Sequence, residues 1–296
     1  MDLDLAKLAT DLSVRFPDAN PIAPLRVLGS GMGNLVVETP SGAVFRIARD
    51  KETAARFNFE RLLLKELTPH LPVSVPQPTW QASDLPEEPH GVMGYQKLDG
   101  VPLDGEVLEG ERARTLGADV GKFLAALHAV SPSDLRTRLP VYDPKQLISN
   151  TFCTSIRELV SARASTQETD ALDRWLIRAP TLFPNDSLVL CHSDLWYENV
   201  LVSGSFRLMG ILDWGNASVS HPAQDFAALH YNGETYLKSA CDAYAKLTRE
   251  DSAELMVQSS AFLVLRELVG LQWATEHRTE EVADALAKVI ALLMAA

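Results

Sequence analysis

The sequence predicts an α+β fold in two parts, a small antiparallel sheet with one helix followed by a mostly helical region. Three observations predict it. Short apolar runs separated by glycine-containing turns occupy residues 25–48. Residues 52–67 then carry apolar side chains at helical spacing without glycine or proline. Later segments, such as 111–129 and 282–293, repeat that helical spacing, and a chain of 296 residues with 46% hydrophobic residues can bury both parts.

Three strands are expected in the amino-terminal part, at residues 25–28, 35–38 and 43–48. The connection between the first two is rich in glycine, and glycines let backbone N–H groups approach phosphate oxygens closely. Taken alone, this pattern fits an ordinary hairpin better than a phosphate site. The phosphate interpretation gains weight only from charges on the elements that follow. The residues of this connection that could bind phosphate are Ser30, Gly31, Gly33 and Asn34.

Arg46 places a charge within the third apolar strand, AVFRIA, and a charge in such a strand needs a partner. Glu60 is the expected partner, because it lies at the edge of the apolar stripe on the following helix. From that position it could also face solvent. Arginine binds phosphate bidentately and keeps its charge, so Arg46 is a candidate phosphate ligand. The alternative for both residues is an ordinary surface salt bridge.

Residues 191–213 contain three polar side chains that suit phosphoryl transfer: Asp194, Asn199 and Asp213. Such a reaction needs a carboxylate beside the attacking hydroxyl and hard oxygen ligands for magnesium ions. Asp194 can supply the carboxylate beside the hydroxyl, and the Asn199 amide oxygen and the Asp213 carboxylate can supply the ligands for magnesium. The alternative is that these residues only form turns, which Asp and Asn favour.

The local structure predicted for this stretch brings two of the three residues together. An apolar run before Asp194 is predicted as a strand, so Asp194 lies on the loop after a rigid element. Strands at 200–202 and 206–212 are joined by a serine–glycine–serine turn and should form a hairpin. Because a hairpin returns the chain to its starting end, Asp213 is expected beside Asn199.

The motif HSDLWYEN, followed by ILDWG and HPAQDFA, resembles the motifs of the aminoglycoside phosphotransferase and choline kinase family, whose members are similar in fold to protein kinases. The resemblance implies a two-lobed protein-kinase-like fold with Asp194 as the catalytic base. It implies Asn199 and Asp213 as the magnesium ligands. It also implies that His192 and Asp225 brace the catalytic loop, although Asp225 could instead cap a helix.

In the amino-terminal part, the resemblance matches Arg46 to the family's strand lysine and Glu60 to its helix partner. Arginine in place of lysine departs from the commonest pattern, and the two side chains differ in shape. Residues 91–105 resemble the hinge between lobes, in the pattern of aminoglycoside 2''-phosphotransferases. The hinge residues implied to lie near the purine are Tyr95, Gln96 and Leu98. The expected division is a nucleotide-binding lobe at 1–94, a hinge at 95–105 and a helical lobe at 106–296 with the catalytic loop and acceptor site.

Composition restricts the choice of partners. The net charge of −12 argues against nonspecific nucleic-acid binding and gives weak support to a cationic substrate. Three widely separated cysteines indicate neither a disulfide framework nor a zinc motif. The first sixteen residues do not resemble a secretion signal, and charges interrupt the apolar stretch 261–273, so no membrane span is expected. We therefore expect a cytoplasmic protein. A monomer is expected rather than an oligomer, although the sequence carries no signal for oligomeric state.

The acceptor site is predicted from position alone. Relatives bind amino sugars with acidic side chains from the catalytic loop, the segment after the DWG-like motif and the carboxy-terminal helices. Each matched residue apart from Asp194 has an alternative as a solvated side chain, or for Trp273 as part of the core. The matched positions are Asp194, Glu198, Glu234, Glu267 and Trp273.

The leading functional prediction is an O-phosphotransferase that moves the γ-phosphoryl group of ATP or GTP, with Mg²⁺, to a hydroxyl of an aminoglycoside antibiotic and so gives resistance. A second prediction keeps this chemistry with a macrolide, choline or another small metabolite as acceptor. A third is a catalytically silent nucleotide-binding module, suggested by Arg46. A hydrolase is excluded, because no G-x-S-x-G nucleophile elbow is present.

Overall fold

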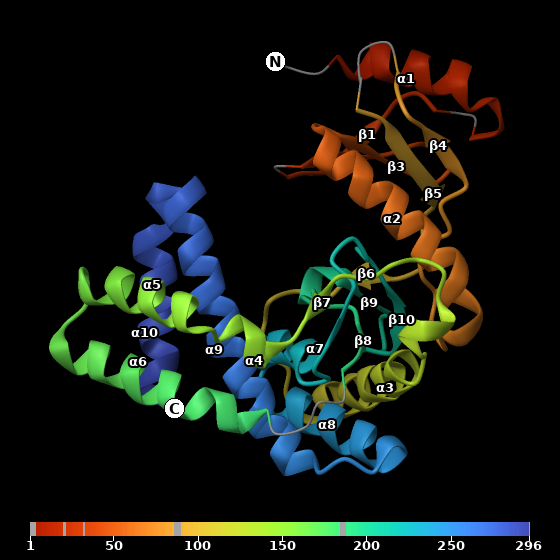
Figure 1. Ribbon diagram of the computed structural model, residues 1–296. Helices are drawn as coiled ribbons and strands as arrows, with labels where there is room; N and C mark the ends of the chain where they lie inside the picture. The colour runs from red at the N-terminus through yellow and green to blue at the C-terminus, as the bar shows by residue number, and fades with distance from the viewer. Residues whose placement is uncertain (1–3, 20–21, 32, 86–89, 184–187, 296) are drawn as a thin grey trace.

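The computed structural model describes residues 4–19, 22–31, 33–85, 90–183 and 188–295, and these form two lobes (Figure 1). The amino-terminal lobe contains a five-stranded antiparallel sheet in the order β1-β2-β3-β5-β4. Two helices, α1 (Leu5–Arg15) and α2 (Lys51–Leu67), belong to this lobe. The strands are β1 (Arg26–Ser30), β2 (Asn34–Glu38), β3 (Ala43–Ala48), β4 (Trp80–Ala82) and β5 (Val92–Gln96).

Strand β3 is buried along its whole length, because a helix covers each face of the sheet. Successive side chains of a strand point to opposite faces. Phe45 packs in the core that includes α1 and stacks on Phe16, with ring centroids 5.6 Å apart. Its neighbour Arg46 points to the other face, where it contacts Phe57 and Glu60 of α2. The strand thus aims one charged side chain away from the apolar core.

The carboxy-terminal lobe is mostly helical, with two small three-stranded sheets. One sheet has the order β10-β9-β6 and the other β7-β11-β8. Its strands are β6 (Val101–Pro102), β7 (Val141–Tyr142), β8 (Val189–Cys191), β9 (Val200–Val202), β10 (Leu208–Ile211) and β11 (Ser218–Ser220). Its helices are α3 (Gly110–His128), α4 (Pro144–Leu147), α5 (Asn150–Ser161), α6 (Thr166–Arg178), α7 (Gln224–Ala227), α8 (Glu234–Thr248), α9 (Ser252–His277) and α10 (Val282–Ala295).

Helices α3 and α8 pack closely beneath the small sheets (Figure 1). Two glycines of α3 make this approach possible. A Cβ atom on Gly117 would lie 2.5 Å from the Tyr236 carbonyl oxygen, and one on Gly121 would collide with the Ala240 carbonyl oxygen. Helices α5, α6 and α10 gather at the other side of the lobe around the long helix α9 (Figure 1).

The two lobes have separate apolar cores, although the carboxy-terminal half of α2 joins the core of the large lobe through Leu63, Leu64 and Leu67. Strand β5 continues through the expected boundary between residues 94 and 95, because Tyr95 and Gln96 pair with β3. The division at 94/95 and 105/106 stays a prediction. The α+β class with a small antiparallel sheet and a helical second lobe is confirmed.

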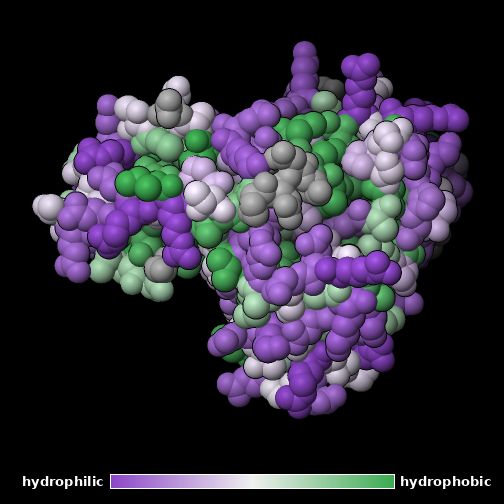
Figure 2. All heavy atoms as spheres, turned by 60° about the horizontal axis from the view of Figure 1, so that its bottom comes forward, coloured by the Kyte–Doolittle hydropathy of each residue, from purple (hydrophilic) through white to green (hydrophobic). Residues whose placement is uncertain are grey.

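Hydrophilic side chains cover most of the face drawn in Figure 2, with smaller hydrophobic areas between them. This distribution fits the acidic composition of the chain. Among the described residues, no helix combines the length and the apolar character that crossing a membrane requires.

Candidate functional site

The loop between β8 and β9 carries Asp194, and the buried carboxylate of Asp225 holds this loop. The backbone N–H groups of His192 and Ser193 donate to its two oxygens, at 2.8 and 2.7 Å. Ser193 has a φ of 70°, in the left-handed region that residues other than glycine rarely occupy. Asp225 therefore stabilises a backbone conformation that this loop would not readily adopt by itself.

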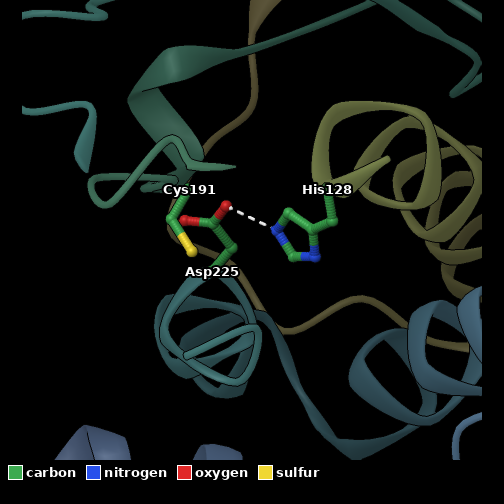
Figure 3. A group of neighbouring side chains, drawn as sticks. All are labelled: His128, Cys191 and Asp225. Carbon is green, nitrogen blue, oxygen red and sulfur yellow. Dashed lines mark hydrogen bonds and ion pairs between the residues drawn. The ribbon is translucent and has the colours of Figure 1, made fainter. Parts of the chain in front are cut away.

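Figure 3 shows the surroundings of Asp225, where His128 of α3 and Cys191 of β8 lie beside it. The Nε2 atom of His128 lies 3.1 Å from Asp225 Oδ2, and its Nδ1 atom lies 2.9 Å from the Tyr244 hydroxyl. The Cys191 thiol faces two backbone carbonyl oxygens at 3.6 and 3.7 Å, and burial raises the pKa of this thiol well above its ordinary value. Hydrogen bonds among protein groups satisfy this cluster, and a neutral thiol is a poor metal ligand.

His192 connects the loop to the end of the β9–β10 hairpin. Its Nε2 atom lies 2.9 Å from the Leu212 carbonyl oxygen, and the backbone N–H of Asp194 donates to its Nδ1 atom at 3.3 Å. The ring packs edge-on against Trp214, with centroids 4.7 Å apart. The imidazole thus lies between the loop that carries Asp194 and the strand end that carries Asp213.

The hairpin brings Asn199 and Asp213 to the same end. The Leu212 N–H donates to the Asn199 carbonyl oxygen at 2.8 Å, so the two chain segments are adjacent. The Asn199 side-chain N–H₂ donates to the Asp194 carbonyl oxygen at 2.9 Å, which leaves the amide oxygen for another partner. Asp213 has a φ of 57°, and its side chain is 43% exposed. An amide oxygen and a carboxylate are ligands that magnesium prefers, so these residues fit such an ion.

Arg46 connects the small lobe to this hairpin. Its Nη1 atom lies 2.7 Å from Glu60 Oε2, and its Nη2 atom lies 3.1 Å from Asp213 Oδ1. Burial opposes the charge of Arg46, but Glu60 and Asp213 outweigh it and raise the pKa of the guanidinium. The backbone N–H of Trp214 also donates to Glu60, at 3.3 Å. The site therefore holds a permanent positive charge beside Asp213.

The other predicted nucleotide residues lie in two places. Ser30, Gly31, Gly33 and Asn34 form the turn between β1 and β2, and their neighbour at position 32 lies outside the described residues. A Cβ atom on Gly33 would lie 2.7 Å from the Thr53 hydroxyl, so α2 closely approaches this turn.

The side chains of the three predicted hinge residues are buried, hydrogen-bonded or packed against neighbouring elements. Burial raises the pKa of Tyr95 to about 12, so its hydroxyl stays protonated. The Gln96 side chain donates to the carbonyl oxygens of Ser41 and Gly42, at 3.3 and 3.0 Å. Leu98 is half-buried against β10, where a Cβ atom on Gly210 would meet it. The described contacts therefore tie these side chains to neighbouring elements.

The predicted acceptor residues are spread more widely. Glu198 and Glu234 are exposed, and no described hydrogen bond joins either to Asp194. Glu267 accepts a hydrogen bond from the Tyr231 hydroxyl at 2.9 Å. Trp273 is 39% exposed and stacks on His277, so it lies at the surface of α9 rather than in the core. The structure thus brings Asp194 together with Asn199 and Asp213, whereas no described hydrogen bond or ion pair joins Asp194 directly to any of these four residues.

Two groups beside Asp194 were not predicted. The Nη2 atom of Arg266, on α9, lies 3.0 Å from Asp194 Oδ1, and the Asn216 amide donates to Oδ2 at 3.2 Å. The Arg266 guanidinium also lies over the Trp196 ring, 4.1 Å from its centroid. Arg266 interrupts an apolar helical stretch. A charge in such a segment needs a partner, as Arg46 does in its strand, so this signal could have predicted that Arg266 is paired.

The arrangement combines a carboxylate on a braced loop, an amide oxygen and a carboxylate that fit a divalent cation, and a fixed positive charge that could bind phosphate. These are the groups that phosphoryl transfer to a hydroxyl requires.

The pattern of the phosphotransferase enzyme family matches residues 24–255. Viomycin phosphotransferase of Streptomyces vinaceus is 29% identical over 161 residues, which are 52% of this chain and 54% of that protein. The match therefore spans about half the length of that relative. The matched region includes Arg46, the loop that carries Asp194, and Asp225.

Solved structures match along nearly the whole chain. A complex of APH(2'')-IIIa with GDP and kanamycin has a TM-score of 0.84 at 22% identity, covering 98% of both chains. Macrolide 2'-phosphotransferase MphH from Brachybacterium faecium has a TM-score of 0.72 at 24% identity, again over 98% of both chains. This likeness confirms the predicted two-lobed fold.

Proposed function

The chain belongs to the phosphotransferase enzyme family, and from that premise we propose that it transfers the γ-phosphoryl group of ATP or GTP to a hydroxyl group of a small molecule. The single observation that carries the proposal is the convergence of Asp194, Asn199 and Asp213, with Arg46 in contact with Asp213. We expect the enzyme to act as a monomer in the cytoplasm, where both nucleotides are available.

In the proposed mechanism, Asp194 orients the acceptor hydroxyl and accepts its proton as the hydroxyl oxygen bonds to the γ-phosphorus. The bond from this phosphorus to the β-phosphate oxygen breaks, and nucleoside diphosphate leaves. Arg46 binds phosphate oxygens, and the turn around Gly33 supplies backbone N–H groups to them. The Gly31 N–H donates to the Asn34 carbonyl oxygen at 3.0 Å, so the role of Gly31 is to let the phosphate approach the turn closely. Asn199 and Asp213 would hold Mg²⁺, which neutralises the negative charge of the polyphosphate.

Tyr95, Gln96 and Leu98 are proposed to lie along the purine, with backbone groups rather than the engaged Gln96 side chain forming the contacts. Glu60 is proposed to keep Arg46 in place. His192 and Asp225 are proposed to act by holding the loop, since their described contacts are with the loop backbone and the Leu212 carbonyl.

We propose an aminoglycoside as the acceptor, so that the reaction would give resistance. Support comes from relatives described with kanamycin, gentamicin and streptomycin, and from the acidic side chains Glu198, Glu234 and Glu267 as candidates for binding amines. Trp273 is the candidate for packing against a sugar ring. A macrolide is the second candidate, because macrolide phosphotransferases share the fold.

The test measures nucleoside diphosphate release and phosphorylated product with Mg²⁺ and either ATP or GTP, across aminoglycosides, macrolides, viomycin, choline and simple sugars. We expect turnover with an aminoglycoside, loss of that turnover in Asp194→Asn, and retained nucleotide binding. Asp173→Asn is the control, since Asp173 pairs with Arg157 on an exposed helical surface and has no described contact with Asp194. Nucleotide binding without turnover for any acceptor would instead support a catalytically silent module.

A further inference from the structure

Arg49 joins the end of strand β3 to the glycine-rich turn between β1 and β2. Its backbone N–H donates to the Gly33 carbonyl oxygen at 2.9 Å, and its Nη2 atom donates to the Ser30 hydroxyl oxygen at 2.6 Å. Because Asn34 pairs with Ala48 in the sheet, the turn extends past the paired strands and lies beside Arg49. One residue therefore holds the turn through its backbone and through its side chain.

The first turn of helix α2 approaches the glycine-rich turn as well. A Cβ atom on Gly33 would lie 2.7 Å from the Thr53 hydroxyl, so glycine permits this close approach. The Asp50 carboxylate caps the helix by accepting the Thr53 N–H at 2.7 Å, and this hydrogen bond lowers the pKa of Asp50. The glycine-rich turn is thus held by two neighbouring elements.

The charge of Arg49 acts only locally. Asp50 and Lys51 follow it directly in the chain and contribute opposite charges. In the described part of the chain, no ion pair joins Arg49 to Asp50 or to another carboxylate. Both side chains are exposed, where water and salt screen their charges. A long-range attraction of phosphate by Arg49 is therefore small, and its directed hydrogen bond to Ser30 is the interaction with a consequence.

This hydrogen bond determines what the Ser30 hydroxyl can do. A hydroxyl has one proton to donate and two lone pairs that accept, whereas a guanidinium only donates. Arg49 therefore occupies a lone pair of Ser30, and the hydroxyl proton points away from Arg49. Hydrogen bonds in a chain polarise one another, so a hydroxyl that accepts from a cation becomes a better donor. Among the described residues no group accepts the Ser30 proton, which leaves it for a phosphate oxygen at the turn.

We propose that Arg49 is a positioning residue for the donor nucleotide, which orients the Ser30 hydroxyl so that it donates to a phosphate oxygen. This inference rests on the proposed function, in which the glycine-rich turn meets the polyphosphate. Arg49 acts through Ser30 and does not itself bind the nucleotide, whereas Arg46 binds the phosphates directly. The contribution of Arg49 therefore depends on the phosphates and is absent for a nucleoside.

The test compares ligands with and without phosphates. Dissociation constants of GDP, guanosine, ADP and adenosine are measured with Mg²⁺ and no acceptor, by ligand-observed NMR. In Arg49→Gln, the diphosphate should bind about three- to tenfold more weakly, with nucleoside binding and the melting temperature unchanged. Arg49→Lys keeps a charged donor and should recover part of the loss. Arg26→Gln is the matched control and should behave as wild type, because Arg26 pairs with Glu38 at the end of the same hairpin that lies away from the turn.

A double-mutant cycle shows whether Arg49 acts through Ser30. Ser30→Ala should weaken diphosphate binding to a similar extent, and adding Arg49→Gln to it should cause no further loss. Additive losses, or equal losses for diphosphate and nucleoside, would overturn the inference. Diphosphate binding that Arg49→Gln leaves unchanged also overturns the inference, while the proposed function stands. A wild-type protein that binds neither GDP nor ADP overturns the proposed function and the inference together.

Discussion

Arg46 and Glu60 form an ion pair in which Nη1 and Oε2 lie 2.7 Å apart, and the Glu60 side chain is fully removed from solvent. Arg46 joins strand β3 to helix α2 through this pair and reaches Asp213 of the other lobe with its second nitrogen. One planar side chain thus makes a contact within its own lobe and a contact across the two lobes.

Replacing Arg46 by alanine should lower the free energy of unfolding by about 3–5 kcal/mol, because it leaves Glu60 buried without its partner. Denaturant unfolding at neutral pH measures this change. Arg26→Ala is the matched control, since Arg26 also pairs with a glutamate but is 67% exposed. That variant should lose less than about 1 kcal/mol, and equal losses in both variants would contradict the importance of burial.

Asp225→Asn should lower kcat for phosphoryl transfer with little change in the KM for nucleotide. An asparagine places an N–H₂ group against backbone N–H groups that now donate to a carboxylate. Leaving one buried donor unpaired costs about 1–3 kcal/mol, so the melting temperature should fall as well. Asp251→Asn is the control, because Asp251 caps α9 by accepting two backbone N–H groups, a role that asparagine fills equally well.

Gly121→Ala should destabilise the large lobe by about 1–3 kcal/mol, since its methyl group would collide with the Ala240 carbonyl and force α3 and α8 apart. Gly270→Ala, in α9, meets nothing within 4 Å and should stabilise the protein by up to about 1 kcal/mol through helix propensity. Thermal unfolding of the two variants measures the difference, and a neutral Gly121→Ala would show that the helices can separate without cost.

Acidification should destabilise the fold through His221. Burial lowers the pKa of this histidine from 6.5 to about 4. Between these values the unfolded chain binds a proton that the folded chain does not, so stability falls as the pH drops from 6.5 towards 4. A shift of this size corresponds to about 3 kcal/mol. His221→Asn should flatten the dependence of unfolding free energy on pH in this window.

The parts of this fold that the sequence predicted correctly are those that short-range sequence patterns determine. Strand β3 and helix α2 follow from apolar spacing, and the β9–β10 hairpin follows from two short strands around a serine–glycine–serine turn. These signals operate over a few residues, where the backbone decides the geometry. The position of Asp213 beside Asn199 follows from the hairpin alone.

The parts of the fold and of the site that were not predicted depend on contacts between segments far apart in sequence. Arg266 lies 72 positions from Asp194, and no periodicity connects them. Likewise, the pairing of β6 with β9 and the sheet of β7, β11 and β8 join segments that are far apart in sequence. Arg46 and Arg266 both interrupt apolar elements. Only Arg46 was given a partner, because Glu60 lies on the helix that directly follows its strand. The roles predicted for the site residues stay predictions.

The guanidinium at position 46 also has a consequence for chemical labelling. Nucleotide probes that transfer an acyl group depend on a neutral amine near the phosphates, and lysine can supply one because its pKa shifts readily. Glu60 and Asp213 raise the pKa of Arg46 instead, so this group stays protonated and non-nucleophilic. If position 46 lies beside the phosphates, as proposed, amine-directed activity profiling of nucleotide-binding proteins would therefore not label it even with nucleotide probe bound.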